Sequence, residues 1–406
     1  MRDQGGSSQS DDQLGADEAA AFLGVSKATL YSYVSRGMLT SRRLTSGSLK
    51  RVYHRAELSA LKHRAGFRKN PEQAATEVIE FGIPILTTAI SQITESEHSY
   101  RGISSRDLAR EARFEQVAEF LWTGVREEGR LPPANHAWGL QIDVALADSS
   151  PTDHSPIERM QALLPELQHR SLHGFGTRPA ALVPSAIEVM RYLVYLSCGR
   201  QVAGSVAASL AVSWGADPQR LDTLLTVVAD HELNIATFTA RCAASAGASL
   251  HQAVLAGLAS LQGYRHLYGQ VSEAKLFFQE VLDSGSPEDV IRSYLRRRGT
   301  IPGVHNPYRR LYVGHDPRVV TLVENLAGTE RFEVLTETLR LIEVATQEPP
   351  RIDFLLAVSE PLLGLPHDAI HSVIGIGRSA GIIAHVLEQY GSDHVIRPRA
   401  RYVGVV

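Results

Sequence analysis

Residues 230–268 combine histidine, carboxylate, amide and glycine residues in a pattern that supports acid–base chemistry. The segment reads DHELNIATFTARCAASAGASLHQAVLAGLASLQGYRHLY. It begins with a cluster of polar residues and continues with expected helices rich in small residues, followed by a turn that starts at a glycine and carries His266. Arginines stand in three further motifs, at Arg318 (DPR), Arg378 (GRS) and Arg397 (IRPR). Guanidinium groups bind carboxylates in a bidentate manner, which points to an anionic ligand. Taken alone, each arginine is more often a surface residue or half of a structural ion pair.

A carboxylate completes this set of candidate groups. Asp353 stands in the run RIDF, directly after Pro349-Pro350. As an isolated residue it would be a helix N-cap, because aspartate is favoured there. A carboxylate and a histidine can also move protons, provided that the fold brings them to one substrate. The surrounding elements therefore decide between the two interpretations.

The chain divides into a basic head and an acidic body. Residues 1–70 contain 12 Lys and Arg against 6 Asp and Glu, a balance of +6, whereas residues 71–406 carry −9 and the total is −3. This asymmetry favours a small anion-binding module on a larger domain. We expect a disordered tail over 1–13, which is polar and lacks a hydrophobic period, and a linker over 64–74.

The head predicts two short helices joined by a glycine turn. Asp17 is expected to cap the first helix and Gly24 to end it, and Ser26 opens the second helix. A short strand over 51–53 and a helix over 55–61 follow. The pattern is therefore helix, turn, helix and a basic wing.

The run ADEAAAFLGVSKATLYSYVSRGMLTSRR…RVYHRAELSAL resembles winged helix-turn-helix modules of the MerR type over residues 14–63. The resemblance implies binding to double-stranded DNA, with the second helix against phosphates and base edges. The candidate DNA-binding residues supply hydroxyl groups or positive charge: Ser26, Lys27, Thr29, Tyr31, Arg36, Arg42, Arg43, Lys50 and Arg51. The alternative is a helical protein-docking module whose basic residues are merely solvated.

Beyond the linker, helical period dominates and strand-like alternation is scarce, so we predict a mainly α body over residues 75–406. The body contains a His-Glu-x-Asn loop, a Thr-Phe-x-Ala-Arg helix and a Gly-x-x-His turn within 231–266. Three more segments accompany them: YRGISSRDLAREARFEQVAEFLWTG (100–124), GHDPR (314–318) and RIDFLLAVSEPLLGLP…IRPRARY (351–402). In this order the motifs resemble the citrate synthase family.

The resemblance implies a two-domain helical fold, in which a large domain carries a smaller helical domain inserted at about 240–345. It also implies a homodimer whose inter-domain cleft closes over substrate. Substrate binding falls to His231, Arg318, Arg378 and Arg397, the last supplied by the neighbouring subunit. Catalysis falls to Asp353 as the base that deprotonates the acyl-CoA, His266 facing the thioester oxygen, and His305 polarising the ketone.

The loop after the first catalytic histidine departs from the family pattern. Leu267 and Tyr268 follow His266, where the family has glycines. An alternative alignment, anchored on Ser272-Glu273, places Tyr268 at the histidine position instead.

The second histidine loop departs as well. The family places this histidine about one turn closer to the Asp-Pro-Arg motif. His305 lies eleven residues before Asp316, and the position seven residues before Asp316 is occupied by Arg309. Either His305 polarises the ketone after an insertion, or Arg309 has replaced the histidine and brings permanent charge.

The resulting hypothesis is an acyltransferase that condenses acetyl-CoA or propionyl-CoA with oxaloacetate to citrate or 2-methylcitrate. It uses acyl-CoA as a substrate and needs no metal or tightly bound cofactor. The alternative is a DNA-binding transcription regulator whose degenerate body senses oxaloacetate, citrate or an acyl-CoA. A third reading is a scaffold without ligand or catalysis.

Composition excludes several other classes of protein. The 406 residues are 44% hydrophobic and 21% charged, unlike disordered, collagen-like or disulfide-stapled chains. Cys198 and Cys242 are the only cysteines, which fits a reducing compartment. The N-terminus is polar, and no uninterrupted apolar run suits a bilayer span. We therefore expect a cytoplasmic protein without signal peptide, anchor or membrane partner.

Overall fold

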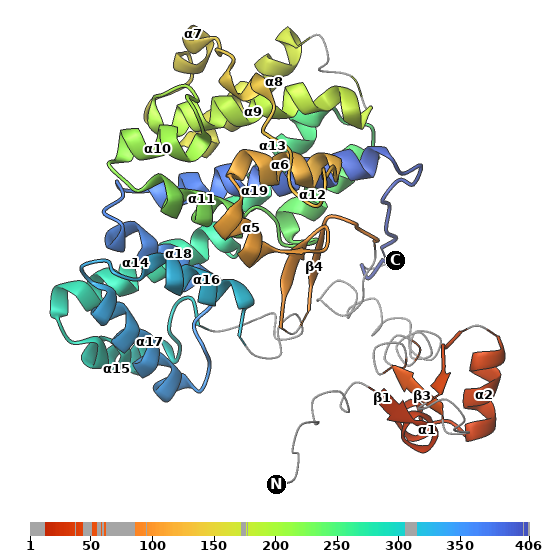
Figure 1. Ribbon diagram of the computed structural model, residues 1–406. Helices are drawn as coiled ribbons and strands as arrows, with labels where there is room; N and C mark the ends of the chain where they lie inside the picture. Colours follow the sequence, from red (N-terminus) through yellow and green to blue (C-terminus); the bar gives the residue numbers. More distant parts are fainter. Residues whose placement is uncertain are drawn as a thin grey trace. The chain divides into compact units, whose positions relative to one another are not determined.

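The computed structural model divides the chain into two compact units, Met1–Thr87 and Thr88–Val406 (Figure 1). It describes the following residues: 13–36, 38–43, 51–54, 58, 61, 86–94, 96–171, 176, 178–304, 315–400 and 402–404. Residues 1–12 of the predicted tail over 1–13, the linker over 64–74, and residues His305, Arg309 and Lys50 lie outside this described part.

The N-terminal unit combines two helices with a small antiparallel sheet. Its elements are β1 (Gln13–Gly15), α1 (Ala16–Leu23), α2 (Lys27–Ser35), β2 (Arg42–Arg43) and β3 (Arg51–His54). The strand order is β1-β3-β2, with Val52 opposite both Gly15 and Arg42. Leu30, Tyr53 and Leu58 are fully buried in a core of its own.

The helix ends explain this local structure. Gly24 ends α1 with φ +67°, in the left-handed region that glycine tolerates, as the sequence predicted. The Ser26 hydroxyl caps α2 by accepting from the Thr29 N–H at 3.2 Å, which was also predicted. The prediction for Asp17 was wrong: Gly15 is the N-cap of α1, and its N–H donates to the Glu18 carboxylate at 2.9 Å.

Two further predictions for this unit have partial outcomes. The strand expected at 51–53 is present as β3. Gln13, expected to end the disordered tail, belongs instead to β1. Of the helix expected over 55–61, only Leu58 and Leu61 are described, and both side chains are buried.

The second unit is mainly helical, as predicted. A small antiparallel sheet precedes the helices and consists of β4 (Ser91–Ile93), β5 (His98–Tyr100) and β6 (Ile103–Ser104). The helices are α5 (Ser105–Glu111), α6 (Phe114–Thr123), η1 (His136–Gly139), α7 (Val144–Asp148), α8 (Pro156–Arg170), α9 (Pro179–Cys198), α10 (Val206–Trp214), α11 (Pro218–Val227), α12 (Ile235–Ser245), α13 (Leu250–Leu261), α14 (Leu267–Ser284), α15 (Pro287–Arg298), α16 (Pro317–Leu326), α17 (Phe332–Thr346), α18 (Ile352–Leu362) and α19 (Ala369–Tyr390).

Helix α19 runs through the centre of this unit, and α6, α9, α11, α12 and α13 pack around it (Figure 1). Nearly every residue of α19 is buried. It is also the one helix of the described part with the length and apolar composition of a membrane span. Its apolar stretch is entirely buried inside the protein. A central core helix has this composition because it must be apolar all round.

Helices α14 to α17 gather on one side of the unit, whereas α12 and α13 pack against α19 (Figure 1). All of these helices belong to one compact unit, Thr88–Val406. The inserted small domain at about 240–345 therefore stays a prediction.

Glycines let α19 approach the end of α11 and the loop after it. A Cβ at Gly377 would lie 2.7 Å from the Leu225 carbonyl oxygen, and one at Gly381 would overlap the Ala229 carbonyl and the Asp230 carboxylate. The Gly381 N–H donates to the Ala229 carbonyl at 2.9 Å. Arg378 lies between these two glycines, so the close approach also sets its position.

We expect Gly381→Ala to destabilise the body by about 2 kcal/mol or more, because the added methyl meets backbone and a buried carboxylate that have no room to move. Helix propensity alone predicts the opposite sign, a gain of about 1 kcal/mol. Gly139→Ala is the control, since no atom lies within 4 Å of its Cβ. Unfolding by urea measures both changes, and an unaltered or raised stability of Gly381→Ala would contradict the packing argument.

Candidate active site

The structure brings four predicted residues together from four elements. His231 follows α11, Arg318 begins α16, Asp353 begins α18, and Arg378 lies in the middle of α19. Arg318, Asp353 and Arg378 are only 3–4% exposed. Burial holds the pKa of His231 well below its ordinary value, and the charges of Arg318 and Arg378 lower it further. The imidazole is therefore neutral and is close enough to two buried guanidinium groups for their charges to lower its pKa.

Asp316 orients the first of these guanidinium groups. The Arg318 Nε donates to one Asp316 oxygen at 2.9 Å and Nη2 donates to the other at 2.6 Å, a bidentate pair. The same carboxylate caps α16 by accepting from the Arg318 N–H at 3.0 Å. Burial opposes ionisation of Asp316, but the charge of Arg318 and the hydrogen bonds from its side chain and backbone together outweigh burial and keep the pKa of this carboxyl below its ordinary value. Arg318 is thus fixed in direction before any ligand binds.

Asp353 is not the N-cap of its helix. Arg351 occupies that position, with φ −100° and ψ 173°, and Asp353 is the second residue of α18. Burial raises the pKa of the Asp353 carboxyl, although Arg351, whose Nη2 lies 3.2 Å from Asp353 Oδ2, and Arg318 act in the opposite direction. A carboxylate whose pKa is raised towards neutrality is a stronger base than an ordinary one.

His266 is the N-cap of α14 and is close enough to Arg378 for that charge to act on its ring. Burial lowers its pKa to about 4, and the charge of Arg378 contributes. The ring is therefore neutral near pH 7, although a hydrogen bond to the Leu261 backbone partly opposes the lowering of its pKa. Gly269 lets the turn close tightly, because a Cβ there would overlap the Tyr264 carbonyl.

Tyr268, the alternative candidate for the histidine position, has different neighbours. Its ring stacks on His371, with centroids 3.9 Å apart. His371 Nε2 lies 3.1 Å from the Ser272 hydroxyl and its Nδ1 lies 3.2 Å from Asp368. This serine–histidine–aspartate order resembles that of nucleophilic triads, but Ser272 is inside α14, where neighbouring N–H groups serve the helix. We assign the cluster a structural role.

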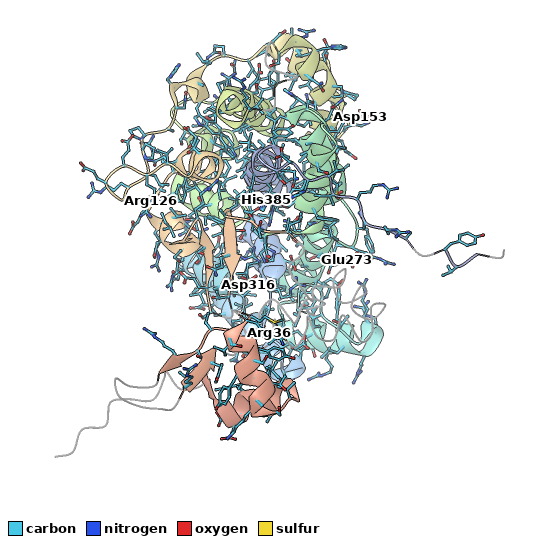
Figure 2. All side chains as sticks on the ribbon, turned by 90° about the vertical axis from the view of Figure 1, so that its right-hand side faces the viewer. Arg36, Arg126, Asp153, Glu273, Asp316 and His385 are labelled. Carbon is cyan, nitrogen blue, oxygen red and sulfur yellow. The ribbon has the colours of Figure 1, made fainter. Side chains whose placement is uncertain are left out.

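A buried polar network supports the loop that carries His231. The Tyr100 hydroxyl donates to the Thr226 carbonyl at 2.9 Å and accepts from the Asp230 N–H at 3.2 Å. The Asp230 carboxylate accepts from the Ser91 hydroxyl and from the Glu232 N–H, and lies 3.3 Å from His385 Nε2. His385 is inside the body (Figure 2).

Asp230 is ionised in this network. Burial raises the pKa of the carboxyl, but His385, Arg378 and the hydroxyl of Ser91 together lower it to about 2. On the other side of His385, Arg241 donates to Glu388 at 2.8 Å and to Gln389 at 3.0 Å. The network therefore continues from His385 to Arg241 of α12 and to the last turn of α19.

Sequence reasoning missed several of these supporting residues. Tyr100 and Asp230 stand inside motifs that carried the family resemblance, and Asp316 precedes Arg318 by two residues, so adjacency to a predicted site residue was the available signal. His98 and Arg351 belong to no predicted set, although both lower the pKa of His231.

Three predicted residues are not part of the described cluster. His305 and Arg309 lie outside the described residues; the chain before them is described to Val304. Gly303, with φ +75°, packs against Phe354, where a Cβ would lie 2.9 Å from that side chain, and its carbonyl accepts from the Arg351 N–H at 2.9 Å. Arg397 is exposed on the segment that follows α19. Among the described residues, no group of three or more His, Cys, Asp or Glu is placed to hold a metal ion.

The predicted DNA-binding residues that are described lie at the surface or at helix ends of the N-terminal unit. Ser26 and Thr29 hydroxyls are 2.9 Å apart, and the Lys27 ammonium pairs with Asp17 at 2.6 Å. Tyr31 is 48% exposed. Three arginines are exposed as well, namely Arg36, which Figure 2 labels, Arg42 and Arg51. Arg43 belongs to β2, and its side chain is outside the described part.

The family model for the C-terminal domain of citrate synthase matches residues 80–399. The chain belongs to the citrate synthase family. This confirms the family predicted from the body's motifs, and the match begins after most of the N-terminal unit. Similar curated proteins include citrate synthase 2 of Bacillus subtilis (strain 168), 26% identical over 81% of this chain and 96% of that one. Another is the citrate/2-methylcitrate synthase of the same organism, 27% identical over 68% of this chain and 83% of that one.

Solved citrate synthase structures share the fold. The enzyme of Thermotoga maritima has a TM-score of 0.65 at 22% identity and covers 81% of this chain and 96% of its own. The enzyme of Thermoplasma acidophilum, in a ternary complex with carboxymethyl coenzyme A and oxaloacetate, has a TM-score of 0.67 at 19% identity, with coverages of 82% and 96%. The citrate synthase fold of the body, predicted from sequence, is thereby confirmed.

In this member of the citrate synthase family, Asp230→Asn should weaken the pH dependence of stability. Folding lowers the pKa of Asp230 from 3.8 to about 2, so its contribution, about 2 kcal/mol, is present above pH 4 and is lost as the pH falls towards 2. Urea unfolding between pH 2 and pH 7 measures it. The variant should lose stability at pH 7 and approach the unmutated protein at pH 2.

The matched control is Asp153→Asn, since Asp153 is exposed (Figure 2). Its pH profile of stability should run parallel to that of the unmutated protein. A parallel profile for Asp230→Asn as well would show that the Asp230 network carries no pH-dependent stabilisation.

Proposed function

We propose that the body condenses acetyl-CoA or propionyl-CoA with oxaloacetate, giving citrate or 2-methylcitrate. The observation that carries this proposal is the meeting of His231, Arg318, Asp353 and Arg378 at one buried site in a citrate-synthase-family chain. Curated relatives bear the names citrate synthase and 2-methylcitrate synthase; the latter, from Shewanella oneidensis, is 31% identical over 46% of this chain and 50% of its own. Both acyl chains are therefore candidates.

The charge of the site suits a dianion. Arg318 and Arg378 are both buried, and Asp316 compensates the first. Arg318 and Arg378 would each bind one oxaloacetate carboxylate, with neutral His231 donating a further hydrogen bond. Arg397, exposed in the single chain, would reach the neighbouring subunit's site in a homodimer.

Carbon–carbon bond formation requires an enolate of the acyl-CoA. Asp353 would remove a proton from the carbon next to the thioester, while the N–H of neutral His266 donates to the thioester oxygen. The enolate carbon then attacks the ketone carbon of oxaloacetate, and the former ketone oxygen takes a proton. Water cleaves the resulting thioester, which releases the acid and the CoA thiol. Acyl-CoA is thus a substrate, and no bound cofactor is needed.

The group that polarises the ketone would be His305, with Arg309 as the alternative. Support for His305 comes from Gly303, whose packing against Phe354 holds the preceding turn beside the helix that carries Asp353. An arginine at this place would add permanent charge to the site, whereas a histidine can donate and return a proton.

We expect Asp353→Asn to lower turnover at least 100-fold, as for loss of a general base, with little change in oxaloacetate affinity. Arg378→Ala should weaken oxaloacetate binding by about 30-fold or more, because it removes a buried charged contact. Release of CoA thiol from acetyl-CoA and propionyl-CoA measures turnover, and calorimetry measures binding. Equal loss of binding in both variants would refute this division of labour.

The N-terminal unit favours a second activity, binding to double-stranded DNA. Two helices joined by a three-residue turn accompany an antiparallel sheet whose first strand precedes them and whose other two strands follow them, an arrangement that fits a winged helix-turn-helix of the predicted MerR type. The exposed Arg36 and Arg42 supply positive charge near the second helix. A dimer would present two such helices about 34 Å apart, one turn of DNA. In the alternative, regulatory reading, ligand binding to the body changes DNA affinity.

Arg36→Ala and Arg42→Ala should each weaken binding to a random 30-base-pair duplex and reduce the slope of log K against log salt by about 1. Exposed Arg126, in the second unit (Figure 2), provides the control as Arg126→Ala. Fluorescence anisotropy between 50 and 200 mM salt measures both quantities. Over this range a protein that makes several phosphate contacts loses roughly 1,000-fold or more in DNA affinity. Unchanged slopes would favour the protein-docking alternative.

Linkage separates the enzyme from the regulator. If oxaloacetate changes the affinity for DNA by some factor, DNA must change the affinity for oxaloacetate by the same factor. Turnover without such coupling describes an enzyme that carries a DNA-binding head. Coupling without turnover describes a sensor.

A further inference from the structure

His98 is a buried histidine that the proposed reaction does not use. It begins β5 and is 1% exposed. Its Nδ1 lies 3.0 Å from the Ser105 hydroxyl, whereas its Nε2 is buried without a hydrogen-bond partner in the described structure. Leaving such a group unpaired is destabilising, so native proteins retain it where something compensates.

The surroundings of His98 are those of the proposed oxo-acid site. Its ring centroid lies 5.8 Å from that of His231, with the planes tilted by 40°. Burial lowers its pKa to about 3, and Arg318 and Arg378 contribute, while Asp316 and Asp230 act in the opposite direction. A neutral imidazole therefore stands among the groups proposed to hold two carboxylates.

Ser105 determines which nitrogen is available. When the Ser105 hydroxyl donates to Nδ1, the single proton of the neutral ring is on Nε2, which is then a donor. The Nε2–H is a donor without a partner near Arg318 and Arg378. An anionic oxygen of a bound ligand would accept its hydrogen bond and would also be attracted by both guanidinium groups. The tautomer with the proton on Nε2 is thus the one that serves a dianion.

We propose that His98 is a second imidazole of the oxo-acid pocket, and that its Nε2–H donates a hydrogen bond to the bound dicarboxylate or to a water molecule held by it. The proposal rests on the function proposed above, binding of a dicarboxylate by His231, Arg318 and Arg378. It makes His98 a specificity-determining residue, because ligands without an oxygen at this place leave Nε2 unpaired.

Three substitutions separate the two ring nitrogens. His98→Gln keeps a polar atom near the place of Nε2, His98→Asn keeps one near the place of Nδ1, and His98→Leu fills the space without polar atoms. Calorimetry with oxaloacetate should show binding about 10- to 100-fold weaker for Leu and Asn, as for a hydrogen bond to a charged group, and nearly unchanged for Gln. In turnover, KM for oxaloacetate should rise while KM for acyl-CoA stays constant.

Ser105→Ala tests the tautomer argument, since it removes the Nδ1 partner that directs the ring proton to Nε2. Oxaloacetate binding should weaken in this variant, but less than in His98→Leu, which removes Nε2 altogether. Thermal unfolding reports whether each variant keeps its fold, and Leu provides a packing-conservative variant if a polar one fails. Equal oxaloacetate affinities for Leu, Asn, Gln and the unmutated protein would overturn the proposal. Rescue by Asn but not by Gln would also overturn it, because the Ser105 contact would then be the important one.

The same binding series separates this inference from the proposed reaction. If the unmutated protein binds citrate, malate or succinate but not oxaloacetate, and the variants keep the predicted order, the role of His98 stands and the condensation proposal fails. If oxaloacetate binds and turns over while the variants equal the unmutated protein, only the His98 proposal fails. Absence of binding by all four acids overturns both.

Discussion

The burial of two guanidinium groups, Arg318 and Arg378, is the constraint on which the rest of the body depends. A buried charge is costly unless it is paired and hydrogen-bonded. Asp316 meets this requirement for Arg318 through a bidentate contact. Around Arg378 the protein places ionised Asp230 and keeps His98, His231 and His266 neutral. The imidazoles remain uncharged chiefly because they are buried, and the charges of neighbouring arginines lower their pKa values further.

This arrangement leaves the site with positive potential, which an anionic ligand can neutralise. The same positive charges also influence the pKa of the Asp353 carboxyl. Burial favours its protonated form, the neighbouring arginines favour its charged form, and burial prevails in the raised pKa of its carboxyl. A dianion would offset the arginines that oppose this rise. Ligand binding and base strength are therefore coupled by electrostatics, with no need for a conformational signal.

Backbone packing makes the charge arrangement possible. Gly377 and Gly381 bring α19 against the end of α11, and Arg378, which lies between them, is near enough to His231 to lower its pKa. The Asp230–His385 contact then ties the loop to the same helix, and Gly303 seats another loop on the start of α18. Each site residue is thus held by an element end or a close helix contact, which suits the precision that catalysis needs.

The sequence by itself determined the mainly α class, the family of the body and the identity of His231, Arg318, Asp353 and Arg378 as candidates, because helical period and short motifs are local properties. It also predicted the Gly24 and Ser26 helix ends, which depend on the residues themselves. Other features required the tertiary structure: Gly15 in place of Asp17 as a cap, Arg351 in place of Asp353, and the pairing of Asp316 with Arg318. His98 was invisible to motif reasoning, since a lone histidine in a short strand has no characteristic spacing. Its significance comes from its neighbours His231, Arg318 and Arg378. These neighbours and the burial of His98 arise only when segments distant in sequence meet in the fold.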